Sequence, residues 1–248
     1  MSEQAPKKRE DAGTATESVA DELVRMIIGH MPPGASLPSE AELAIQHGVS
    51  RVTVREAVKM VAGRGLLDLA RGRRAMVREP DAAGLGEFIS FIVQNDEKGV
   101  FDLVEARMSL EVQAAGLAAR RIGRPKILEL EHALRGMRDA RHAGGEEDED
   151  AFHEADIGFH QAIIRAGDNR ILLGMFEAMA PSIRRSFLLS RRGRQVRGQP
   201  SEHTVLAHQR ILDCITAGDP PGAEAAMRVH LTDAARDMRA ALEAPDRT

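Results

Sequence analysis

Apolar residues recur at every third or fourth position through most of the chain from about residue 84 to residue 243. This is the spacing of one face of an α-helix, and strand-like alternation is absent from the same stretch. Glycine, asparagine and proline interrupt the pattern, as they do where helices end. The pattern predicts seven helices, near residues 85–95, 101–121, 125–142, 151–166, 169–190, 201–217 and 220–243. We therefore expect residues 85–243 to fold as an all-helical bundle.

The preceding part of the chain carries a different signature, a set of short helices followed by a basic hairpin. Two capping boxes and one capping serine mark the expected helix starts: Thr14 with Glu17, Ser39 with Glu42, and Ser50. Two short extended pieces follow, Leu66–Leu69 and Ala75–Val77, joined by a basic turn. This order predicts a winged helix-turn-helix over residues 14–78, with a disordered tail at 1–13 and a linker at 79–84. The expected fold class is therefore mainly α.

Charge is distributed unevenly between these two parts. Residues 50–78 carry a net charge of +6, whereas residues 79–248 carry −6, so the overall charge of −4 hides a basic region. A basic cluster is often only a solvated face, but this asymmetry is also typical of a nucleic-acid-binding part joined to an acidic part.

The composition excludes several classes of protein. The single cysteine, Cys214, excludes an internal disulfide framework and a cysteine-based zinc finger, and it fits a reducing cytoplasm. No apolar run approaches the roughly 18–20 residues that cross a bilayer, so we expect no membrane partner. The polar start of the chain also leads us to expect no signal peptide.

Five short motifs follow one another in the basic part: Leu37-Pro-Ser-Glu40, Leu43-Ala44, Gly48-Val-Ser-Arg51, Val54-Arg-Glu-Ala57 and Gly65-Leu66. In this order they resemble the N-terminal domain of the GntR family of bacterial transcription regulators. A recognition helix places its first residues against the major groove, and a wing reaches the neighbouring minor groove or the backbone. The expected DNA-binding residues are Ser50, Arg51, Val52, Thr53 and Arg55 on the helix, with Arg71, Gly72 and Arg73 on the wing.

Three departures from the family pattern concern which DNA sequence is read. Ala41 stands where the family usually has an arginine, and Val52 replaces a common threonine. Arg74-Ala75-Met76 replaces the usual Gly-Thr-Phe of the wing. These differences affect the operator sequence rather than DNA binding itself. A winged helix that contacts protein instead of DNA is the alternative interpretation.

The bundle carries four polar residues at positions expected to face its interior. Asp156 and His160 lie one helical turn apart, and His208 and His230 each fall within the apolar stripe of another helix. A single histidine on such a face is usually a hydrogen-bonded core residue. A buried polar group without a partner costs about 1–3 kcal/mol, and one shared cation would satisfy all four groups. Three imidazoles and a carboxylate suit a divalent ion, zinc first and otherwise nickel or manganese.

Arg107 also lies within an apolar stripe, and a guanidinium that faces a core needs an anion. That anion is either Glu111, one turn away, or the carboxylate of a bound ligand. His153 and His203 lie further round their helices, so we expect them on the surface. The stretches 146–150 and 191–194 are expected to be solvated loops.

Three parts of the bundle carry a second resemblance: Glu105-Ala-Arg107 with Leu110-Glu111, Asp156-Ile-Gly-Phe-His160 with Asn169, and the pair His208 and His230. They resemble the ligand-binding C-terminal domain of the FadR subfamily of GntR regulators, the FCD domain. Most members bind a metal through one Asp and three His and sense small carboxylic acids beside it. The resemblance implies the metal ligands Asp156, His160, His208 and His230. It also implies that Arg107 and Asn169 contact the effector.

These features together predict a transcription regulator, expected to be a repressor, that binds double-stranded DNA as a homodimer at a pseudo-palindromic operator. A small carboxylic acid is the expected effector. One alternative is a constitutive DNA binder whose four ligands close a purely structural metal site. A metal-dependent enzyme is disfavoured, because Asp156 is used as a ligand and no separate nucleophile is evident.

Overall fold

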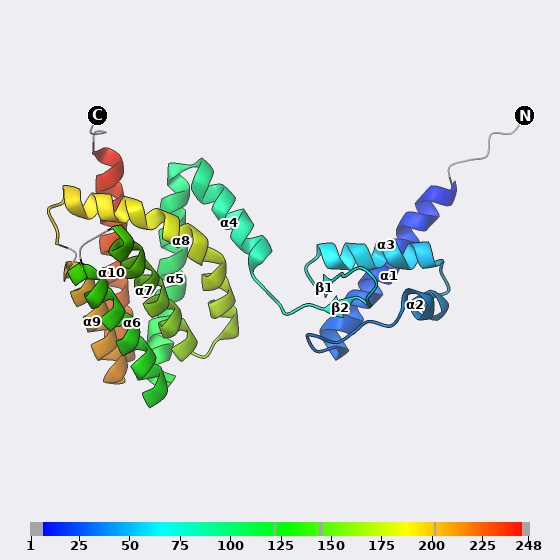
Figure 1. Ribbon diagram of the computed structural model, residues 1–248, viewed down its shortest axis with the longest axis horizontal. Helices are drawn as coiled ribbons and strands as arrows, with labels where there is room; N and C mark the ends of the chain where they lie inside the picture. The colour runs from blue at the N-terminus through cyan, green and yellow to red at the C-terminus, as the bar shows by residue number, and fades with distance from the viewer. Residues whose placement is uncertain (1–6, 122, 144–145, 201, 245–248) are drawn as a thin grey trace, which may run out of the picture. The chain divides into compact units, whose positions relative to one another are not determined.

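The computed structural model describes residues 7–121, 123–143, 146–200 and 202–244. These residues form ten helices and one two-stranded sheet, so the predicted fold class, mainly α, is confirmed. The chain divides between Asp81 and Ala82 into two compact units, unit 1 and unit 2 (Figure 1). None of the helices in the described part of the chain combines the length and hydropathy that a bilayer crossing requires.

Unit 1 contains three helices and a hairpin. The helices are α1 (Lys7–His30), α2 (Glu40–His47) and α3 (Arg51–Gly63), and the strands are β1 (Leu67–Asp68) and β2 (Met76–Val77). The strands pair antiparallel, with Leu67 opposite Val77. Apolar residues from all three helices and both strands share one core, in which Leu23, Leu43 and Val61 are almost completely buried. The winged helix-turn-helix predicted from the sequence is therefore present.

The helix caps of unit 1 are largely those that the sequence predicts. Ser39 and Glu42 form the expected capping box at the start of α2, and the Ser50 side chain accepts the Thr53 backbone N–H at the start of α3. The predicted start of the first helix at Thr14 is wrong, because α1 begins at Lys7. Residues 7–13 are helical instead of a disordered tail, since this stretch is rich in the helix formers Lys, Arg, Glu and Ala. Residues 1–6 of the predicted tail lie outside the described residues.

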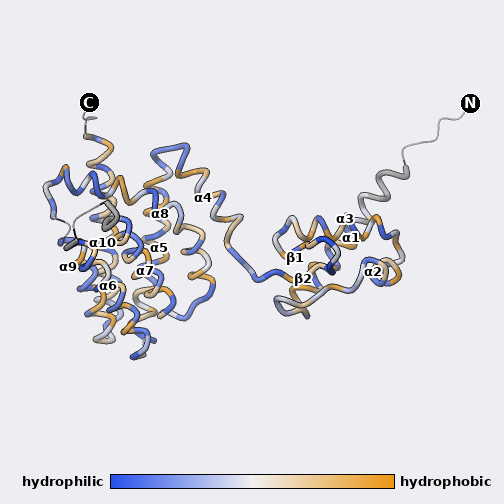
Figure 2. Tube along the Cα trace, in the orientation of Figure 1, coloured by the Kyte–Doolittle hydropathy of each residue, from blue (hydrophilic) through white to orange (hydrophobic). Residues whose placement is uncertain are grey.

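Unit 2 contains the seven predicted helices: α4 (Ala83–Asn95), α5 (Glu97–Arg121), α6 (Arg124–Ala143), α7 (Glu146–Ala166), α8 (Arg170–Val196), α9 (Glu202–Thr216) and α10 (Pro220–Glu243). Helix α10 packs against α5, α8 and α9, and α7 packs against α5, α6 and α8. Polar and apolar segments alternate along the helices in Figure 2, as expected of helices that bury one face. Two apolar clusters fill the interior, around Phe159 and around Phe176.

Two expected loops of unit 2 are instead helical. Residues 146–150 form the start of α7, and residues 191–194 extend α8 beyond its predicted end at residue 190. The extension packs closely against α10. A Cβ added at Gly193 would lie 1.6 Å from the carbonyl oxygen of Asp237, so this close approach requires glycine. Arg194 on the same turn is buried rather than solvated.

Candidate metal centre and DNA-reading surface

Four polar side chains from three helices meet in the interior of unit 2. Helix α7 supplies Asp156 and His160, α9 supplies His208, and α10 supplies His230. One potential ligand atom from each residue lies within 4.8 Å of those of the other three. All four residues are buried, and His208 is completely inaccessible. The structure thus brings together all four residues that the sequence analysis selected as metal ligands.

Hydrogen bonds orient two of the histidines toward the centre of this cluster. The Nδ1 atom of His208 lies 2.8 Å from the carbonyl oxygen of Thr204, which requires a proton on Nδ1. The Nδ1 atom of His160 faces Oε2 of Glu111, which likewise favours a proton there. In the neutral form of each ring, Nε2 therefore carries the lone pair. This carboxylate- or carbonyl-supported arrangement is usual for histidines that bind metals.

The facing polar atoms lie close enough to share a cation. The Nε2 atoms of His160 and His208 are 3.2 Å apart, and Oδ1 of Asp156 lies 3.1 Å from Nε2 of His208. Lone pairs at such distances repel one another unless a proton or a metal ion is shared among them. Nitrogen and carboxylate donors of this kind fit a divalent transition metal. The donor atoms of these four residues therefore fit a divalent metal ion.

The charges of the cluster shift its pKa values in the direction that suits metal binding. Burial lowers the pKa of His230 well below its usual value, and the charges of His208 and His160 lower it further, so this ring is neutral at neutral pH. Burial alone raises the pKa of Asp156, but its hydrogen bond to His208 and the surrounding histidine charges hold that pKa well below its usual range. His230 therefore offers a neutral imidazole and Asp156 an ionised carboxylate, the forms that bind a metal.

Arg107 forms a buried ion pair beside this cluster. Its Nε atom donates to Oε1 of Glu111 at 2.6 Å, and the two residues are 5% and 1% exposed. Burial raises the pKa of Glu111, but Arg107 and His160 lower it to about 2. Glu111 thus links the guanidinium to one of the metal-ligand candidates. The bond to Glu111 uses only Nε, so the Nη1 and Nη2 groups can serve another acceptor.

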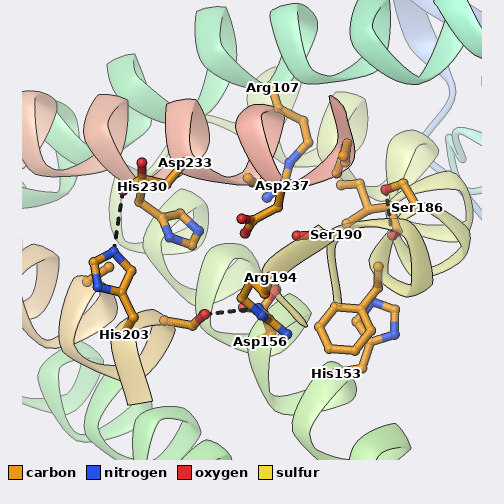
Figure 3. A pocket seen from close by; sticks show the side chains of 16 residues that line it. Arg107, His153, Asp156, Ser186, Ser190, Arg194, His203, His230, Asp233 and Asp237 are labelled. Carbon is orange, nitrogen blue, oxygen red and sulfur yellow. Dashed lines mark hydrogen bonds and ion pairs between the residues drawn. The ribbon is translucent and has the colours of Figure 1, made fainter. Parts of the chain in front are cut away.

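A cavity of about 50 Å³ lies next to the cluster (Figure 3). Arg107, Asp156 and His230 line it together with polar residues of α8, α9 and α10, among them Ser186, Ser190, Thr204, Asp233 and Asp237. A cavity needs about 10–15 Å³ for each water molecule, so this one has room for a few waters or a compact polar group. Both expected roles of Arg107 are therefore compatible with its position, because it pairs with Glu111 and also lines the cavity.

Two lining residues differ from what the sequence suggested. His153, expected on the surface, is 5% exposed and stacks on Phe187 with ring centroids 3.8 Å apart. Burial lowers its pKa. Arg194 was expected in a solvated loop, but it donates to Oγ1 of Thr204 at 2.9 Å and lies over the ring of Phe187. His203 also lines the cavity, although its side chain is 47% exposed.

Sequence spacing contains a signal that could have identified Arg194 as buried. Ile183, Phe187, Ser190 and Arg194 follow one another at intervals of three or four, which continues the buried face of α8 past its expected end. Asn169 is a different case. Its Oδ1 accepts the backbone N–H groups of Ile171 and Leu172 at the start of α8, and it is not among the residues that line the cavity.

In unit 1 five of the eight predicted DNA-binding residues line one groove, and Ser50, Val52 and Thr53 are not among its lining residues. Arg51 and Arg55 of α3 line it together with Arg71, Gly72 and Arg73 of the hairpin turn. Ser50 caps α3, its Oγ lies 2.8 Å from Oγ1 of Thr53, and Val52 is 67% exposed. Gly72 has φ of 75°, a conformation that glycine adopts readily in a tight turn. Helix α3 and the hairpin turn thus face the same groove.

Comparison with known proteins agrees with this architecture. Residues 15–77 match the gntR family of bacterial regulatory proteins, and residues 102–233 match the FCD domain. A candidate L-lactate dehydrogenase operon regulator of Escherichia coli strain K12 is 31% identical over 88% of this chain and 83% of its own length. The transcriptional regulator LutR of Bacillus subtilis is 28% identical over 83% of this chain and 92% of its own. The galactonate operon transcriptional repressor of Escherichia coli strain K12 is 25% identical over 90% of this chain and 96% of its own length.

A solved structure extends the likeness to the fold. The GntR protein of Streptococcus agalactiae has a TM-score of 0.70 and 26% sequence identity, and the match covers 88% of this chain and 97% of that one. The two family matches and the similar regulators lead to one conclusion. The chain belongs to the GntR family of bacterial transcription regulators, and its helical unit is an FCD domain.

Proposed function

We propose that this regulator is a repressor whose affinity for its operator is controlled by a small carboxylic acid bound beside a divalent metal. The observation that carries the proposal is the position of Arg107, whose buried guanidinium lines the same cavity as Asp156 and His230. A guanidinium is well suited to a carboxylate, and the neighbouring cluster is suited to a metal. The two groups therefore offer one acid two points of attachment.

The metal would be held by Asp156, His160, His208 and His230, with zinc as the first candidate. When bound, the ion supplies positive charge and coordination positions that attract an acid's oxygens. Glu111 keeps the His160 ring oriented and keeps Arg107 charged within the core. Asn169, which caps α8, remains a weaker candidate for effector contact.

The relatives support an acid as the effector. Two of their names refer to L-lactate and to galactonate, and both compounds are carboxylic acids. The cavity of about 50 Å³ favours a compact acid over a long acyl chain. All relatives named above are regulators rather than enzymes, which supports a regulatory function for this chain. A regulator of bacterial genes would act in the cytoplasm, where the DNA is.

A homodimer on a pseudo-palindromic operator completes the proposal. Helix-turn-helix regulators commonly bind two half-sites through a symmetric pair of subunits. Helix α4 presents Leu85, Phe88 and Phe91 at helical spacing, and they are 44%, 61% and 70% exposed. Aromatic residues exposed on one helix face are typical of an interface. We therefore assign α4 to the contact between subunits.

A dye-based thermal-shift panel of carboxylic acids, run on metal-loaded and chelated protein, tests the proposal. A dye is needed because the chain contains no Trp and no Tyr. We expect one acid to raise the midpoint by several degrees only when metal is present, and to change DNA affinity by about 5–150-fold. Tight metal binding without a response to any acid would instead support a structural metal and a constitutive DNA binder. Chemical conversion of the acid would indicate an enzyme.

A further inference from the structure

The groove of unit 1 combines six basic side chains with one acidic side chain. The basic residues that line it are Arg51, Arg55, Lys59, Arg71, Arg73 and Arg74. The acidic residue is Glu40, in the first turn of α2. A carboxylate weakens the attraction of a basic groove for DNA phosphates. Its presence on a DNA-reading surface therefore points to a role other than affinity.

Glu40 holds Arg55 through hydrogen bonds from Nε to both carboxylate oxygens and from Nη2 to Oε2. Nε of Arg55 donates to Oε1 at 3.1 Å, and Nη2 donates to Oε2 at 2.7 Å. The Arg55 and Glu40 side chains are 57% and 40% exposed, and an exposed ion pair contributes little to folding. Two parallel bonds nevertheless fix the plane of the guanidinium. The hydrogen bond from Arg55, helped by the charges of Arg51 and Lys59, also lowers the pKa of Glu40, so the carboxylate stays ionised.

This geometry leaves a defined edge of Arg55 for DNA. Glu40 occupies the edge formed by Nε and Nη2, whereas the edge formed by Nη1 and Nη2 still presents two parallel N–H groups. Such a pair matches O6 and N7 of guanine in the major groove. A phosphate at the same edge would lie near the Glu40 carboxylate and be repelled, but the guanine edge carries no net charge.

We propose that Glu40 is a specificity-determining residue that positions Arg55 for a guanine edge and disfavours contacts between Arg55 and phosphate. Glu40 acts through Arg55 and is therefore a positioning residue. Its effect is to lower affinity for unrelated DNA more than affinity for the operator. This inference depends on DNA binding by unit 1 and is independent of the metal and the acid.

The variant Glu40→Gln tests this role, and Glu56→Gln is its matched control. Both changes remove one negative charge from an exposed residue of unit 1, but Glu56 pairs with Lys59 instead of Arg55 and is not among the residues that line the groove. Full-length wild type and both variants would each select duplexes from a random DNA library. Fluorescence anisotropy would then compare the wild-type-selected duplex with a scrambled duplex at several salt concentrations.

We expect Glu40→Gln to bind scrambled DNA at least threefold more tightly and to lose about tenfold in the ratio of scrambled to selected Kd. Its selected motif should also lose preference at one guanine position, which a purely structural role would not change. Glu56→Gln should keep both the ratio and the motif. An unchanged ratio in Glu40→Gln, or an equal loss in Glu56→Gln, overturns the proposal. If Glu40→Gln does not fold, Arg55→Lys is tested in its place and should select a motif that has lost preference at one guanine position. A motif selected by Arg55→Lys that equals the wild-type motif overturns the proposal.

Discussion

At the residue scale, the facing Nε2 atoms of His160 and His208 suit unit 2 to a bound cation. Asp156→Asn keeps the shape of the carboxylate but removes its charge, so the variant should bind metal far more weakly. A ligand at 100 times its Kd stabilises the folded state by about 2.7 kcal/mol. We expect added zinc to raise the wild-type midpoint and to leave that of Asp156→Asn nearly unchanged, with bound metal measured by mass spectrometry. Equal stabilisation of both proteins would place the metal elsewhere.

The ion pair between Arg107 and Glu111 allows a second prediction at this scale. Arg107→Ala leaves the Glu111 carboxylate buried without its arginine, and breaking a buried pair costs about 3–5 kcal/mol. The double variant Arg107→Met with Glu111→Gln should recover most of that loss, because it removes both charges and still offers His160 an acceptor. Urea unfolding measures both effects. The double variant should also retain metal but fail to respond to any acid, and a normal acid response would remove Arg107 from the effector site.

The residues of the candidate metal centre and its cavity could be predicted from the sequence only where their burial follows helical periodicity. Asp156, His160, His208 and His230 were selected because each falls on an inward face of its helix, and the structure brings them together. His153 was missed because ring stacking on Phe187 buries a position at the side of α7, and periodicity cannot show which side a neighbouring helix covers. The orienting role of Glu111 toward His160 joins two helices and has no sequence signal either.

At the scale of the elements, Gly193 marks where α8 and α10 come closest. A Cβ there would overlap the backbone of Asp237, so Gly193→Ala must push the helices apart. We expect a loss of more than about 3 kcal/mol, at or beyond the upper end for overpacked cores. Gly174→Ala, on the same helix with open space around the added Cβ, should instead stabilise by about 1 kcal/mol. Thermal unfolding of both variants checks the contrast, and similar midpoints would contradict this packing.

The number and type of the helices were predictable, whereas some of their ends were not. Glycine or proline lies at five of the six junctions between the seven helices of unit 2, and Asp96 alone separates α4 from α5. The caps at Ser39 and Ser50 are local signals that the structure confirms. The start of α1 was misplaced because Thr14 and Glu17 resemble a cap although helix formers precede them. The end of α8 was misplaced because the close approach of Gly193 to α10 is a tertiary effect that a local pattern does not contain.

At the scale of the whole molecule, the proposed subunit contact through α4 predicts how the protein assembles. The double variant Phe88→Ser with Phe91→Ser removes two exposed aromatic rings while leaving both apolar clusters of unit 2 intact. We expect the wild type to be a dimer and the double variant a monomer by light scattering. DNA affinity should fall as well, because a monomer engages only one half-site. A variant that remains dimeric would place the contact on another surface.

The division between Asp81 and Ala82 gives each unit an apolar core of its own. Substitutions in separate cores have nearly additive effects on stability, because they share no neighbours. Mutations in unit 1 can therefore accumulate without destabilising unit 2, and the reverse also holds. Over evolutionary time, the gntR-type unit and the FCD unit of one chain can change independently of each other.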